Sequence, residues 1–455
     1  MNKREFLAMG GAVPLMLAGC GGSGSGSAPV RLVNASVGYP NLGFMVQSTQ
    51  ATSADVAYGH ASPYENVQAG AVGLTLTVGN SAATSAQTRT INKDQRYSLI
   101  AYGYLNELKP LLIAESSTTP DTGKANINVL NTSVDMGAVD IYLSPTADLS
   151  ISTQIGTSVA GVSQSAFTGV LAGSYFITVV GAGSVQQGIS DVRFQSPQAI
   201  ALTALKTYTV ILTPGASGVL ANAIIMTQGT ADAATPTTPY DNTTARVRAV
   251  TAVPGMATSV VGATAAGAVV TVLASSTTQK YSKYFVVKTG AAPTVTVNGA
   301  AIPVVMDSTN ATTGVTTQVP AVLAAGGDYT IMVYLDSSAA PVAKLIEDNN
   351  TAAVTSAGVK FRLINLASDN QGLELSMSLN GVGIASNVPY GTASDYHEVP
   401  NVPQGTASQL SIENGAASII TKNLVVPLGN VFTEIVVSVP ATGSPLDFFG
   451  SASGN

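Results

Sequence analysis

The sequence predicts an all-β protein of tandem immunoglobulin-like antiparallel β-sandwich domains, which follow a signal peptide and a flexible tether. Short runs rich in Val, Ile, Thr and Tyr recur, and in Leu74–Val78 apolar and polar residues alternate. That period of two is typical of a strand with one buried face. Asn298-Gly299 and Asn380-Gly381 are typical hairpin turns. We find no long helical period after residue 27, and about seven strands in roughly 100 residues is typical of a sandwich.

Composition excludes several classes of protein. Of the 455 residues, 10% are charged and 45% are hydrophobic, a balance opposite to that of intrinsically disordered chains. The net charge of −6 excludes a basic footprint for nucleic acid. The single Cys excludes internal disulfide bonds and cysteine zinc sites, and we expect no cofactor.

Residues 1–19 are expected to be a lipoprotein signal peptide. Lys3 and Arg4 give a positive start, and the apolar run Leu7–Leu17 is too short to span a bilayer. Leu17-Ala18-Gly19-Cys20 resembles the lipobox of bacterial lipoproteins. The resemblance implies cleavage between Gly19 and Cys20 and attachment of palmitate-type acyl chains to Cys20. The alternative is an ordinary secretory signal followed by a buried Cys.

The residues next to Cys20 predict where the protein resides. In Gram-negative lipoproteins an Asp at the following position usually retains the protein in the inner membrane, so Gly21 favours the outer membrane, with the chain periplasmic or surface-exposed. Residues 20–28 are then the lipidated Cys and a flexible Gly/Ser tether. The start Lys3–Leu7 also resembles a degenerate twin-arginine motif, but Lys in the first Arg position favours general secretion.

Four copies of one module are predicted from a recurring opening strand. Its copies are Val30–Ser36, Asn128–Ser133, Val247–Ala252 and Phe361–Ser368, which align Arg31, Asn128, Arg248 and Arg362. The predicted sandwiches span residues 29–120, 124–235, 245–350 and 358–450. We interpret Thr235–Pro239, rich in Pro and Thr, as a stiff spacer between two halves.

A second block recurs later in each copy. It places Tyr97, Tyr208, Tyr329 and Phe432 at one position, each at the start of an apolar run. We expect these rings to be core residues, and the tyrosines to form the tyrosine corner of sandwich domains, in which the hydroxyl bonds nearby backbone. A last apolar strand should follow, and in the fourth copy we place it at Leu446–Phe449.

Several of these blocks together resemble a known family. Val30–Ser36, Tyr58–Tyr64 and Val67–Gly70 resemble the bacterial family called domain of unknown function 4397 (DUF4397), and Met136–Leu143 resembles its second strand. Tyr390–Tyr396 echoes the same pattern in the fourth copy. The resemblance extends over about 30–236, is weaker over 358–450 and is poor over 245–353. It implies a cell-envelope lipoprotein with tandem sandwich modules, and it implies no catalytic residues.

Residues that could carry catalysis do not form a convincing cluster. His397 has Ser394, Asp395 and Glu398 beside it. A Ser/His/Asp site needs three side chains that converge in space, whereas neighbours along a strand point apart. We therefore expect no enzyme, and we interpret His397, like His60, as a loop or edge residue.

A calcium site and a transmembrane helix are two further interpretations that the sequence favours less. Asp307–Asn310, Glu347–Asn350 and Asp369–Gly372 are rich in oxygen ligands, but none has EF-hand spacing, and Asx-rich turns are commoner than calcium sites. We expect no metal. The uncharged stretch Met256–Gln279 could be a transmembrane helix, but its Thr and Gly content favours a pair of strands.

The expected function is therefore non-enzymatic. We expect a cell-envelope lipoprotein with a structural, adhesive or ligand-displaying role, bound to the membrane through its lipid and to a protein or glycan partner. The alternative is a glycan-binding or carbohydrate-processing accessory protein, for which exposed aromatic platforms are needed. There is no Trp, and Tyr39, Tyr64, Tyr104 and Tyr240 stand in turn-like contexts. A hydrolase would need a deep cleft with clustered carboxylates.

Overall fold

The computed structural model describes most of the chain after residue 25. The described ranges are 26–52, 55–147, 149–184, 191–229, 236–264, 267–278, 280–309, 312–353, 358–367, 371–403, 405–415, 417–426 and 431–437. They fall into two compact units. The N-terminal unit runs to Gly215 and includes Ala221–Asn242, and the C-terminal unit contains the chain from Thr243 together with Ala216–Leu220.

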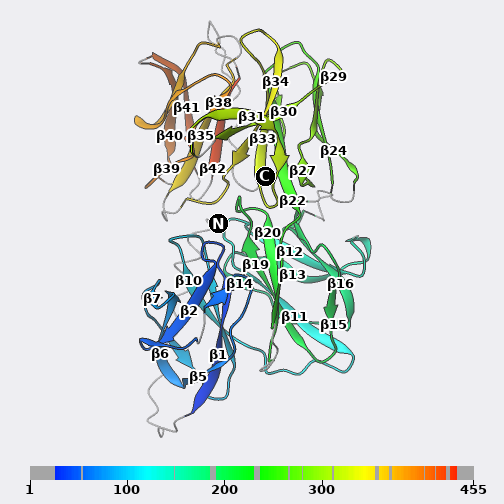
Figure 1. Cartoon of the computed structure of the whole chain (residues 1–455), viewed down its shortest axis with the longest axis vertical. Helices are drawn as coiled ribbons and strands as arrows, with labels where there is room; N and C mark the ends of the chain where they lie inside the picture. The colour runs from blue at the N-terminus through cyan, green and yellow to red at the C-terminus, as the bar shows by residue number, and fades with distance from the viewer. Residues whose placement is uncertain are drawn as a thin grey trace. The chain divides into compact units, whose positions relative to one another are not determined.

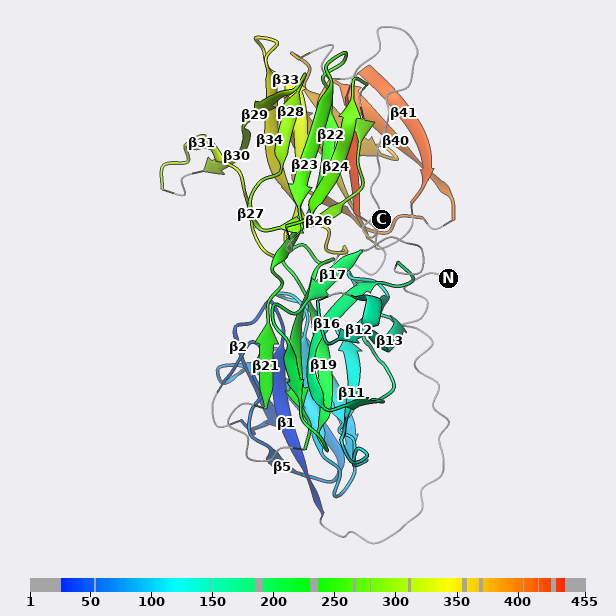
Figure 2. The ribbon, with the colours of Figure 1, turned by 90° about the vertical axis from the view of Figure 1, so that its right-hand side faces the viewer.

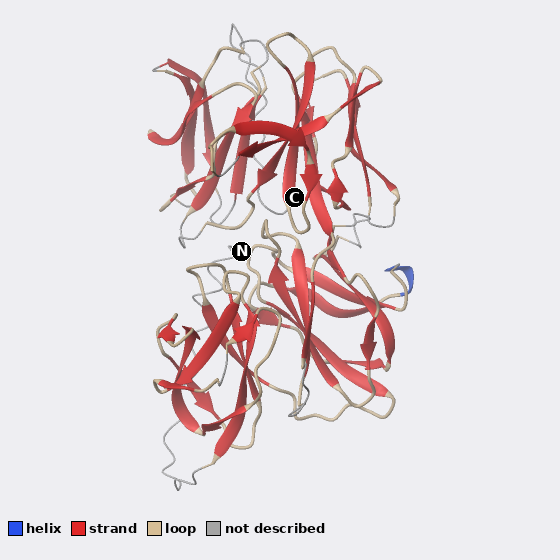
Figure 3. Cartoon of the chain, in the orientation of Figure 1, coloured by secondary structure: helices blue, strands red, loops and turns tan. Residues whose placement is uncertain are grey.

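Nearly every regular element in the described ranges is a strand, as Figure 3 shows, and the exception is the short 3-10 turn η2 (Leu149–Ile151). The predicted all-β, immunoglobulin-like fold class is confirmed. Each unit contains two modules, and each module has two facing sheets around its own apolar core (Figures 1 and 2).

Module 1 has one sheet of order β10-β9-β1-β5 and a second of order β3-β2-β6-β7, to which β4 and β8 add at β2 and β6. Its strands are β1 (Ser27–Ala35), β2 (Asn41–Val46), β3 (Thr49–Gln50), β4 (Val56–Ala57), β5 (Glu65–Gln68), β6 (Gly70–Val78), β7 (Ser81–Ala82), β8 (Gln87–Ile91), β9 (Tyr97–Tyr102) and β10 (Lys109–Ala114).

Module 2 repeats this plan with sheets β14-β11-β19-β20-β21 and β13-β12-β16-β17, with β15 on β11 and β18 on β16. Its strands are β11 (Lys124–Asn131), β12 (Val139–Ser144), β13 (Thr153–Val159), β14 (Ser163–Gln164), β15 (Thr168–Leu171), β16 (Gly173–Gly181), β17 (Val192–Gln195), β18 (Ile200–Leu202), β19 (Thr207–Pro214), β20 (Ala221–Thr227) and β21 (Thr237–Tyr240).

Module 3 has sheets β25-β22-β33-β34-β30-β31, with β26 on β22, and β24-β23-β28-β29, and a small pair β27-β32. Its strands are β22 (Thr244–Thr251), β23 (Thr258–Ala263), β24 (Val269–Ser276), β25 (Lys280–Tyr281), β26 (Phe285–Lys288), β27 (Gly290–Ala291), β28 (Thr294–Val297), β29 (Ala300–Ile302), β30 (Val304–Thr309), β31 (Thr316–Pro320), β32 (Val322–Leu323), β33 (Asp328–Leu335) and β34 (Pro341–Asp348).

Module 4 has sheets β38-β35-β39, with β42 on β35, and β37-β36-β40-β41. Its strands are β35 (Val359–Asn365), β36 (Leu375–Leu379), β37 (Val382–Val388), β38 (Thr392–Ala393), β39 (His397–Val399), β40 (Ala407–Asn414), β41 (Ala417–Val425) and β42 (Val431–Val436). The expected last strand of this copy, Leu446–Phe449, lies outside the described residues.

One recurring pairing departs from a purely antiparallel sandwich, and in module 3 β30 also runs parallel to β34. In every module the opening strand (β1, β11, β22 or β35) runs parallel to the strand that carries the repeated aromatic residue (β9, β19, β33 or β42). The two strands are separated by the whole second sheet, and a long crossover permits a parallel pair where a tight turn does not. The register is the same each time, because Arg31 faces Ser98, Arg248 faces Thr330 and Arg362 faces Thr433.

Two segments predicted to be connectors are part of sheets. Ser27 and Ala28, placed in the tether, begin β1 and pair with β5. The predicted spacer is also wrong over Thr237–Pro239, because β21 pairs antiparallel with β20, whereas Thr235 lies outside the described residues. A strand at the edge of a sheet tolerates Pro, since its missing N–H leaves no central ladder bond unmade, so the Pro content did not reveal the strand.

The repeated Asn of the opening strand fixes the turns at its end. Asn34 donates from Nδ2 to the carbonyl oxygens of Tyr39 and Val56, both at 3.0 Å, and its Oδ1 accepts from the Ser36 amide at 3.1 Å. Asn131 and Asn365 make equivalent bonds in modules 2 and 4. The motif residue therefore links the two sheets of its own module.

The uncharged stretch that begins at Met256 forms the antiparallel pair β23 and β24, as predicted. Within the part of the chain that the structure describes, no helix is long and apolar enough to cross a membrane.

A buried carboxyl in module 4 predicts a pH effect. Glu434 is 2% exposed, and burial raises its pKa to about 8, although Lys422 opposes the shift. Because the folded chain holds this proton more tightly than the unfolded chain, stability should fall as the pH rises from about 4.5 towards 8 and level off above that window. Glu434→Gln should therefore stabilise module 4 by about 2 kcal/mol at pH 8 and change little at pH 4. Urea unfolding at both pH values measures this, and an equal effect at both would contradict it.

Candidate functional site

The opening strand of each module is buried on both of its faces. In β1, Leu32 belongs to the core of module 1, whereas Val33 belongs to a separate apolar cluster shared with module 2. Arg31 is 0% exposed and lies on the same face as Val33. The motif Arg therefore points out of its own sandwich and into the junction between two modules.

Arg31 lies in a compact polar cluster. Its Nη2 lies 2.9 Å from Oε1 of Glu115, its Nε donates to Ser98 Oγ at 3.0 Å, and its guanidinium stacks 4.7 Å from the centre of the Tyr64 ring. The Tyr64 hydroxyl donates to Glu115 at 2.6 Å. We call this combination of Arg, stacked Tyr and carboxylate the Arg–Tyr–acid cluster.

The cluster of module 1 also binds module 2. Arg31 donates from Nη2 to the Thr227 carbonyl at 3.0 Å, and the Gly229 amide donates to Glu115 at 2.9 Å. The Ser116 amide donates to Gln228 at 2.7 Å. Around these bonds an apolar layer joins β1, β9 and β10 to β11, β19 and β20, through Val33, Ala35, Ile100, Ile113, Leu130, Ile211, Ile224 and Met226.

The C-terminal unit uses one acid for two clusters. Asp348, at the end of β34, lies 2.7 Å from Nη1 of Arg362 and 3.6 Å from Nε of Arg248. Arg248 stacks 4.8 Å from the Tyr284 ring centre, and Arg362 stacks 5.0 Å from that of Tyr396. The same carboxylate accepts from Thr330 and from the Tyr284 hydroxyl, both at 2.6 Å. Modules 3 and 4 thus share a buried carboxylate.

Burial and charge act in opposite directions on these groups. Burial alone would raise the pKa of Asp348, but Arg248 and Arg362 outweigh it and hold the pKa below its ordinary value. Burial raises the pKa of Tyr284 well above its usual range, so the hydroxyl remains a donor to Asp348. The cluster is therefore a fixed ion pair under ordinary conditions.

Module 2 replaces all three members of the cluster at once. Asn128 stands where the other modules have Arg, Phe167 stands where they have Tyr, and Gln228 occupies the place of Glu115. Gln228 donates to Thr209 at 2.8 Å, and Thr209 donates to Asn128 at 2.8 Å. In module 2 three uncharged residues have replaced the Arg, the Tyr and the acid together, which indicates that these three positions depend on one another.

The repeated aromatic residues lie on the other face, in the cores. Tyr97, Tyr208 and Tyr329 are 5%, 6% and 4% exposed. Each hydroxyl accepts at 3.0 Å from the backbone amide five residues earlier, that of Asn92, Thr203 or Ala324. Phe432 is half-buried and stacks on Phe361, with ring centres 5.2 Å apart. These contacts have the geometry of a tyrosine corner, without the hydroxyl in module 4.

The aromatic platform considered for glycan binding is not where we expected it. Tyr39, Tyr64, Tyr104 and Tyr240 are all half-buried. Tyr39 accepts from the Asn106 amide at 3.1 Å, and Tyr104 donates to Asp135 of module 2 at 2.7 Å. The Tyr64 hydroxyl likewise donates to Glu115, and Tyr240, at the end of β21, packs against the core of module 2. These rings therefore do not offer free faces.

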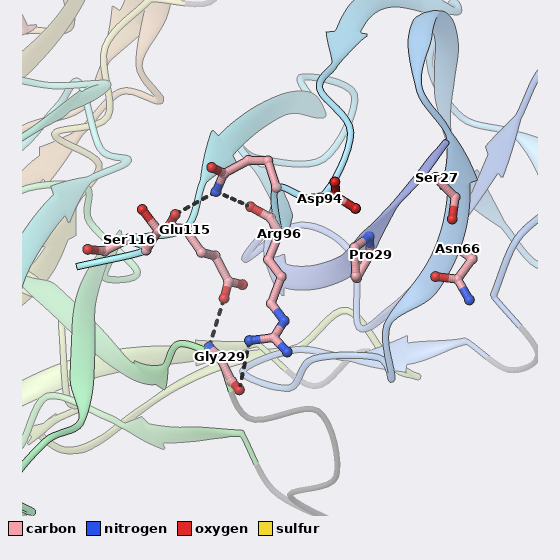
Figure 4. Close-up of a pocket in the computed structure, with 10 residues that line it drawn as sticks. Ser27, Pro29, Asn66, Asp94, Arg96, Glu115, Ser116 and Gly229 are labelled. Atoms are coloured by element: carbon pink, nitrogen blue, oxygen red, sulfur yellow. Dashed lines mark hydrogen bonds between the residues drawn. The ribbon is translucent and has the colours of Figure 1, made fainter. Parts of the chain in front are cut away.

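A polar cleft of about 530 Å³ borders the Arg31 cluster at the junction of modules 1 and 2 (Figure 4). Arg96 crosses it and donates to the Gly229 carbonyl at 3.3 Å, and Asn66 and Ser116 line its walls. The buried carboxylate beside it, Glu115, has both oxygens engaged by protein donors. Asp94 also lines the cleft, but with Glu115 engaged the cleft lacks the available pair of carboxylates that glycoside hydrolysis needs.

The remaining residues considered for catalysis or metal binding do not come together in one site. His397 is exposed on β39, and Asp395 lies beside Tyr396 at the edge of module 4. Among the described residues no group of three or more His, Cys, Asp or Glu side chains could hold a metal ion. Asp348, in the second calcium candidate, binds arginines instead. In the other two candidates, Asn310, Asp369 and Asn370 lie outside the described residues. The predicted cleavage and lipidation residues, Gly19 and Cys20, also lie outside them.

The first module has a match among known families. Residues 28–142 match the family described as Domain of unknown function (DUF4397). This confirms the resemblance for module 1. The DUF4397 match continues through β11 and ends inside β12, so it includes Arg31, Tyr64 and Glu115.

Comparison with solved structures gives only distant likenesses. A candidate cell adhesion protein from Bacteroides uniformis ATCC 8492 is 11% identical, with a TM-score of 0.18, covering 50% of this chain and 98% of its own. Two B repeat units of the collagen binding protein of Staphylococcus aureus are 10% identical, with a TM-score of 0.13, covering 90% of this chain and 95% of their own. No curated protein matches.

Sequence reasoning aligned the motif Arg but missed its partners. Ser62-Pro63-Tyr64, Ser282-Lys283-Tyr284 and Ser394-Asp395-Tyr396 occupy one register against the opening strand. In each, the Ser hydroxyl accepts from the opening-strand amide at 2.9 to 3.0 Å. A Ser-x-Tyr search within the repeats would have found them. Glu115 and Asp348 stand at the end of the last apolar strand of their modules. A charged residue at such a place normally indicates that the strand end is exposed.

Proposed function

We propose that this protein is a non-enzymatic, lipid-anchored envelope protein that holds paired β-sandwich modules away from the outer membrane and presents them to a protein or glycan partner. The observation that carries the proposal is the Arg–Tyr–acid cluster. In the described residues, Arg31 and Glu115 bond to the backbone of module 2, and Arg362 of module 4 pairs with Asp348 of module 3, so the clusters have a structural role. Rigid pairs of sandwiches suit display, because a partner-binding surface keeps its shape under load.

The proposed location rests on the sequence of the N-terminus. Cys20 is the only Cys and follows an apolar segment and a small-residue lipobox. Without Lys3, Arg4 and Glu5 of the signal peptide the net charge of −6 becomes −7, so the folded modules have no net attraction to anionic headgroups. Membrane affinity would then reside in the acyl chains, each buried CH₂ contributing about 0.8 kcal/mol.

Lipid attachment predicts a clear fractionation result. In a Gram-negative host, wild type should incorporate labelled palmitate and pellet with the outer membrane, whereas Cys20→Ser should be unlabelled and soluble or remain an unprocessed precursor. Ser23→Cys in the Cys20→Ser background is the matched control, because it restores a thiol outside the lipobox. An unlabelled wild type, or a Cys20→Ser chain that still pellets, would contradict the anchor.

Display itself is tested on intact cells. Protease added outside should remove the modules from cells that carry wild type, and those cells should be retained on a surface coated with envelope or matrix polymers. Cells with Cys20→Ser should not be retained. If the modules resist the added protease, and cells with Cys20→Ser are retained as well as wild-type cells, the protein would instead have a structural role in the periplasm.

A further inference from the structure

Two exposed leucines lie close together at one end of module 2. Leu171, the last residue of β15, is 68% exposed, and Leu205, in the turn before β19, is 53% exposed. Leu171 faces Lys124 at the start of β11, and the Leu205 amide donates to the Lys124 carbonyl at 2.7 Å. The two leucine backbones are therefore about 10 Å apart, one on each side of β11. We call Leu171 and Leu205 the leucine pair.

The leucine pair differs from the residues at the same positions in modules 1 and 3. At the first position, opposite the first residue of the opening strand, module 1 has Gln68 and module 3 has Lys288. At the second, module 1 has Asp94 and module 3 has Gly326, whose amides donate to the opening strand as that of Leu205 does. In chain order, the three residues at the second position have φ of 61°, 63° and 74°, a left-handed backbone that Asp and Gly tolerate better than Leu. Neither burial nor turn geometry accounts for a leucine there.

The leucine pair lies at the end of the N-terminal unit where the tether joins it. The starts of β1 and β11 are level with each other, because Arg31 of β1 donates to the Thr227 carbonyl, which is in register with Ile127 of β11 through β19. At the other end of the two strands, Ala35 and Leu130 share one apolar cluster. The start of β11, and with it the leucine pair, is therefore at the end where the chain enters β1, the lower end of this unit in Figure 2.

The tether is short enough to keep that end of the unit near a bilayer. Gly26 is the first described residue and follows Cys20 by six residues, so the chain between them spans at most about 22 Å. Two exposed leucines are too few to hold a free protein on a membrane. Once acyl chains anchor the protein, however, the contact is intramolecular and takes place at a high effective concentration. A weak apolar contact is then enough to orient the unit.

We propose that the leucine pair rests in the interfacial layer of the bilayer that holds the acyl chains, and so orients the N-terminal unit end-on. The leucines would bury their side chains below the headgroups, whereas Lys206 beside them is exposed and would keep its ammonium among the headgroups. Lys124 already pairs with Asp121 at 3.0 Å, so the contact is apolar rather than driven by charge. The opposite loops of the unit then face away from the membrane. This inference rests on the lipid anchor proposed above and gives the display function its orientation.

The test follows a fluorescent label on the full lipidated chain in vesicles of phosphatidylethanolamine and phosphatidylglycerol. Cys20 is the only Cys, so its acylation leaves an engineered thiol as the one site for the label. Ala172→Cys places the label beside Leu171, and Ala160→Cys places it on another exposed alanine, next to the strand that pairs with the far end of β11. Nitroxide lipids should quench the label at residue 172 at least about fivefold more than the label at residue 160.

Leu171→Gln with Leu205→Asp gives module 2 the residues that module 1 has at these positions. It should lower quenching at residue 172 at least about threefold, while the lipid keeps the chain on the vesicles. The matched control is Leu105→Gln with Val134→Asp, because these residues are 63% and 48% exposed in turns at the other end of the unit, and it should leave the quenching unchanged. The first double variant should also melt no lower than wild type, since Asp tolerates the left-handed turn.

Equal quenching at residues 172 and 160, or no effect of the leucine substitutions, would overturn the proposal. A label at residue 172 that escapes the nitroxide lipids, but enters a less polar environment as more protein is added to each vesicle, would show that a second copy covers the leucines instead. In these cases a chain that still floats with the vesicles leaves the lipid anchor standing. A chain that does not float would refute the anchor, and this inference with it.

Discussion

Replacing Tyr97 with Ala is expected to lower the free energy of unfolding of the N-terminal unit by about 3–5 kcal/mol. The ring is 5% exposed in the core of module 1, and its hydroxyl accepts the Asn92 amide that closes the turn before β9. The variant leaves a cavity and an unsatisfied backbone donor together. Chemical denaturation followed by circular dichroism measures the loss.

A matched variant separates the two contributions. Tyr97→Phe keeps the ring and removes only the hydroxyl, so it should cost about 1 kcal/mol. Module 4 already has Phe432 at this position, stacked on Phe361. A loss below about 1 kcal/mol for Tyr97→Ala would show that the ring does not support the core and that the repeat alignment is in error.

Removing the shared acid of the C-terminal unit should have an effect of similar size. Asp348→Asn leaves Arg248 and Arg362 buried without their carboxylate, and breaking a buried ion pair from one side costs about 3–5 kcal/mol. The control is Asp336→Asn, because Asp336 lies in the turn after β33 and makes only local hydrogen bonds, to Ser338 and Ala340. A loss no larger than that of the control would contradict the role of the cluster.

A pH series gives an independent check on Asp348. Its folded pKa lies below the ordinary value of 3.8, so the ion pair contributes stability above about pH 4 that is lost as the pH falls through the folded pKa. Asp348→Asn should abolish this part of the acid sensitivity. Adding Arg362→Met to Asp348→Asn should restore part of the lost stability, since it removes one of the two uncompensated charges.

Much of the fold could be predicted from the sequence because strands show a local alternation of apolar and polar residues. Alternation in Leu74–Val78 and the repeat of the Val-Arg-Leu-Val-Asn opening were enough for the sandwich class. The parallel partner of the opening strand was not predictable, because it depends on a crossover through the second sheet. The edge strand β21 was missed because Pro at a sheet edge resembles Pro in a spacer.

The junction was harder to predict for a physical reason. A strand whose two faces are both buried shows Arg31 as a lone charge among apolar residues, and nothing local tells whether that charge faces solvent or a partner. Its companions Tyr64 and Glu115 are far along the chain and are joined only by the fold. The replacement of Arg, Tyr and acid together in module 2 is the sequence signal that links them.

Scanning calorimetry of the full chain tests most directly the central claim that the Arg–Tyr–acid clusters bind modules into pairs. The account predicts two transitions of similar enthalpy, one for modules 1 and 2 and one for modules 3 and 4. Asp348→Asn should move the second transition as a whole to lower temperature and leave the first in place. Four separate transitions, or a shift confined to half of the second transition, would contradict it.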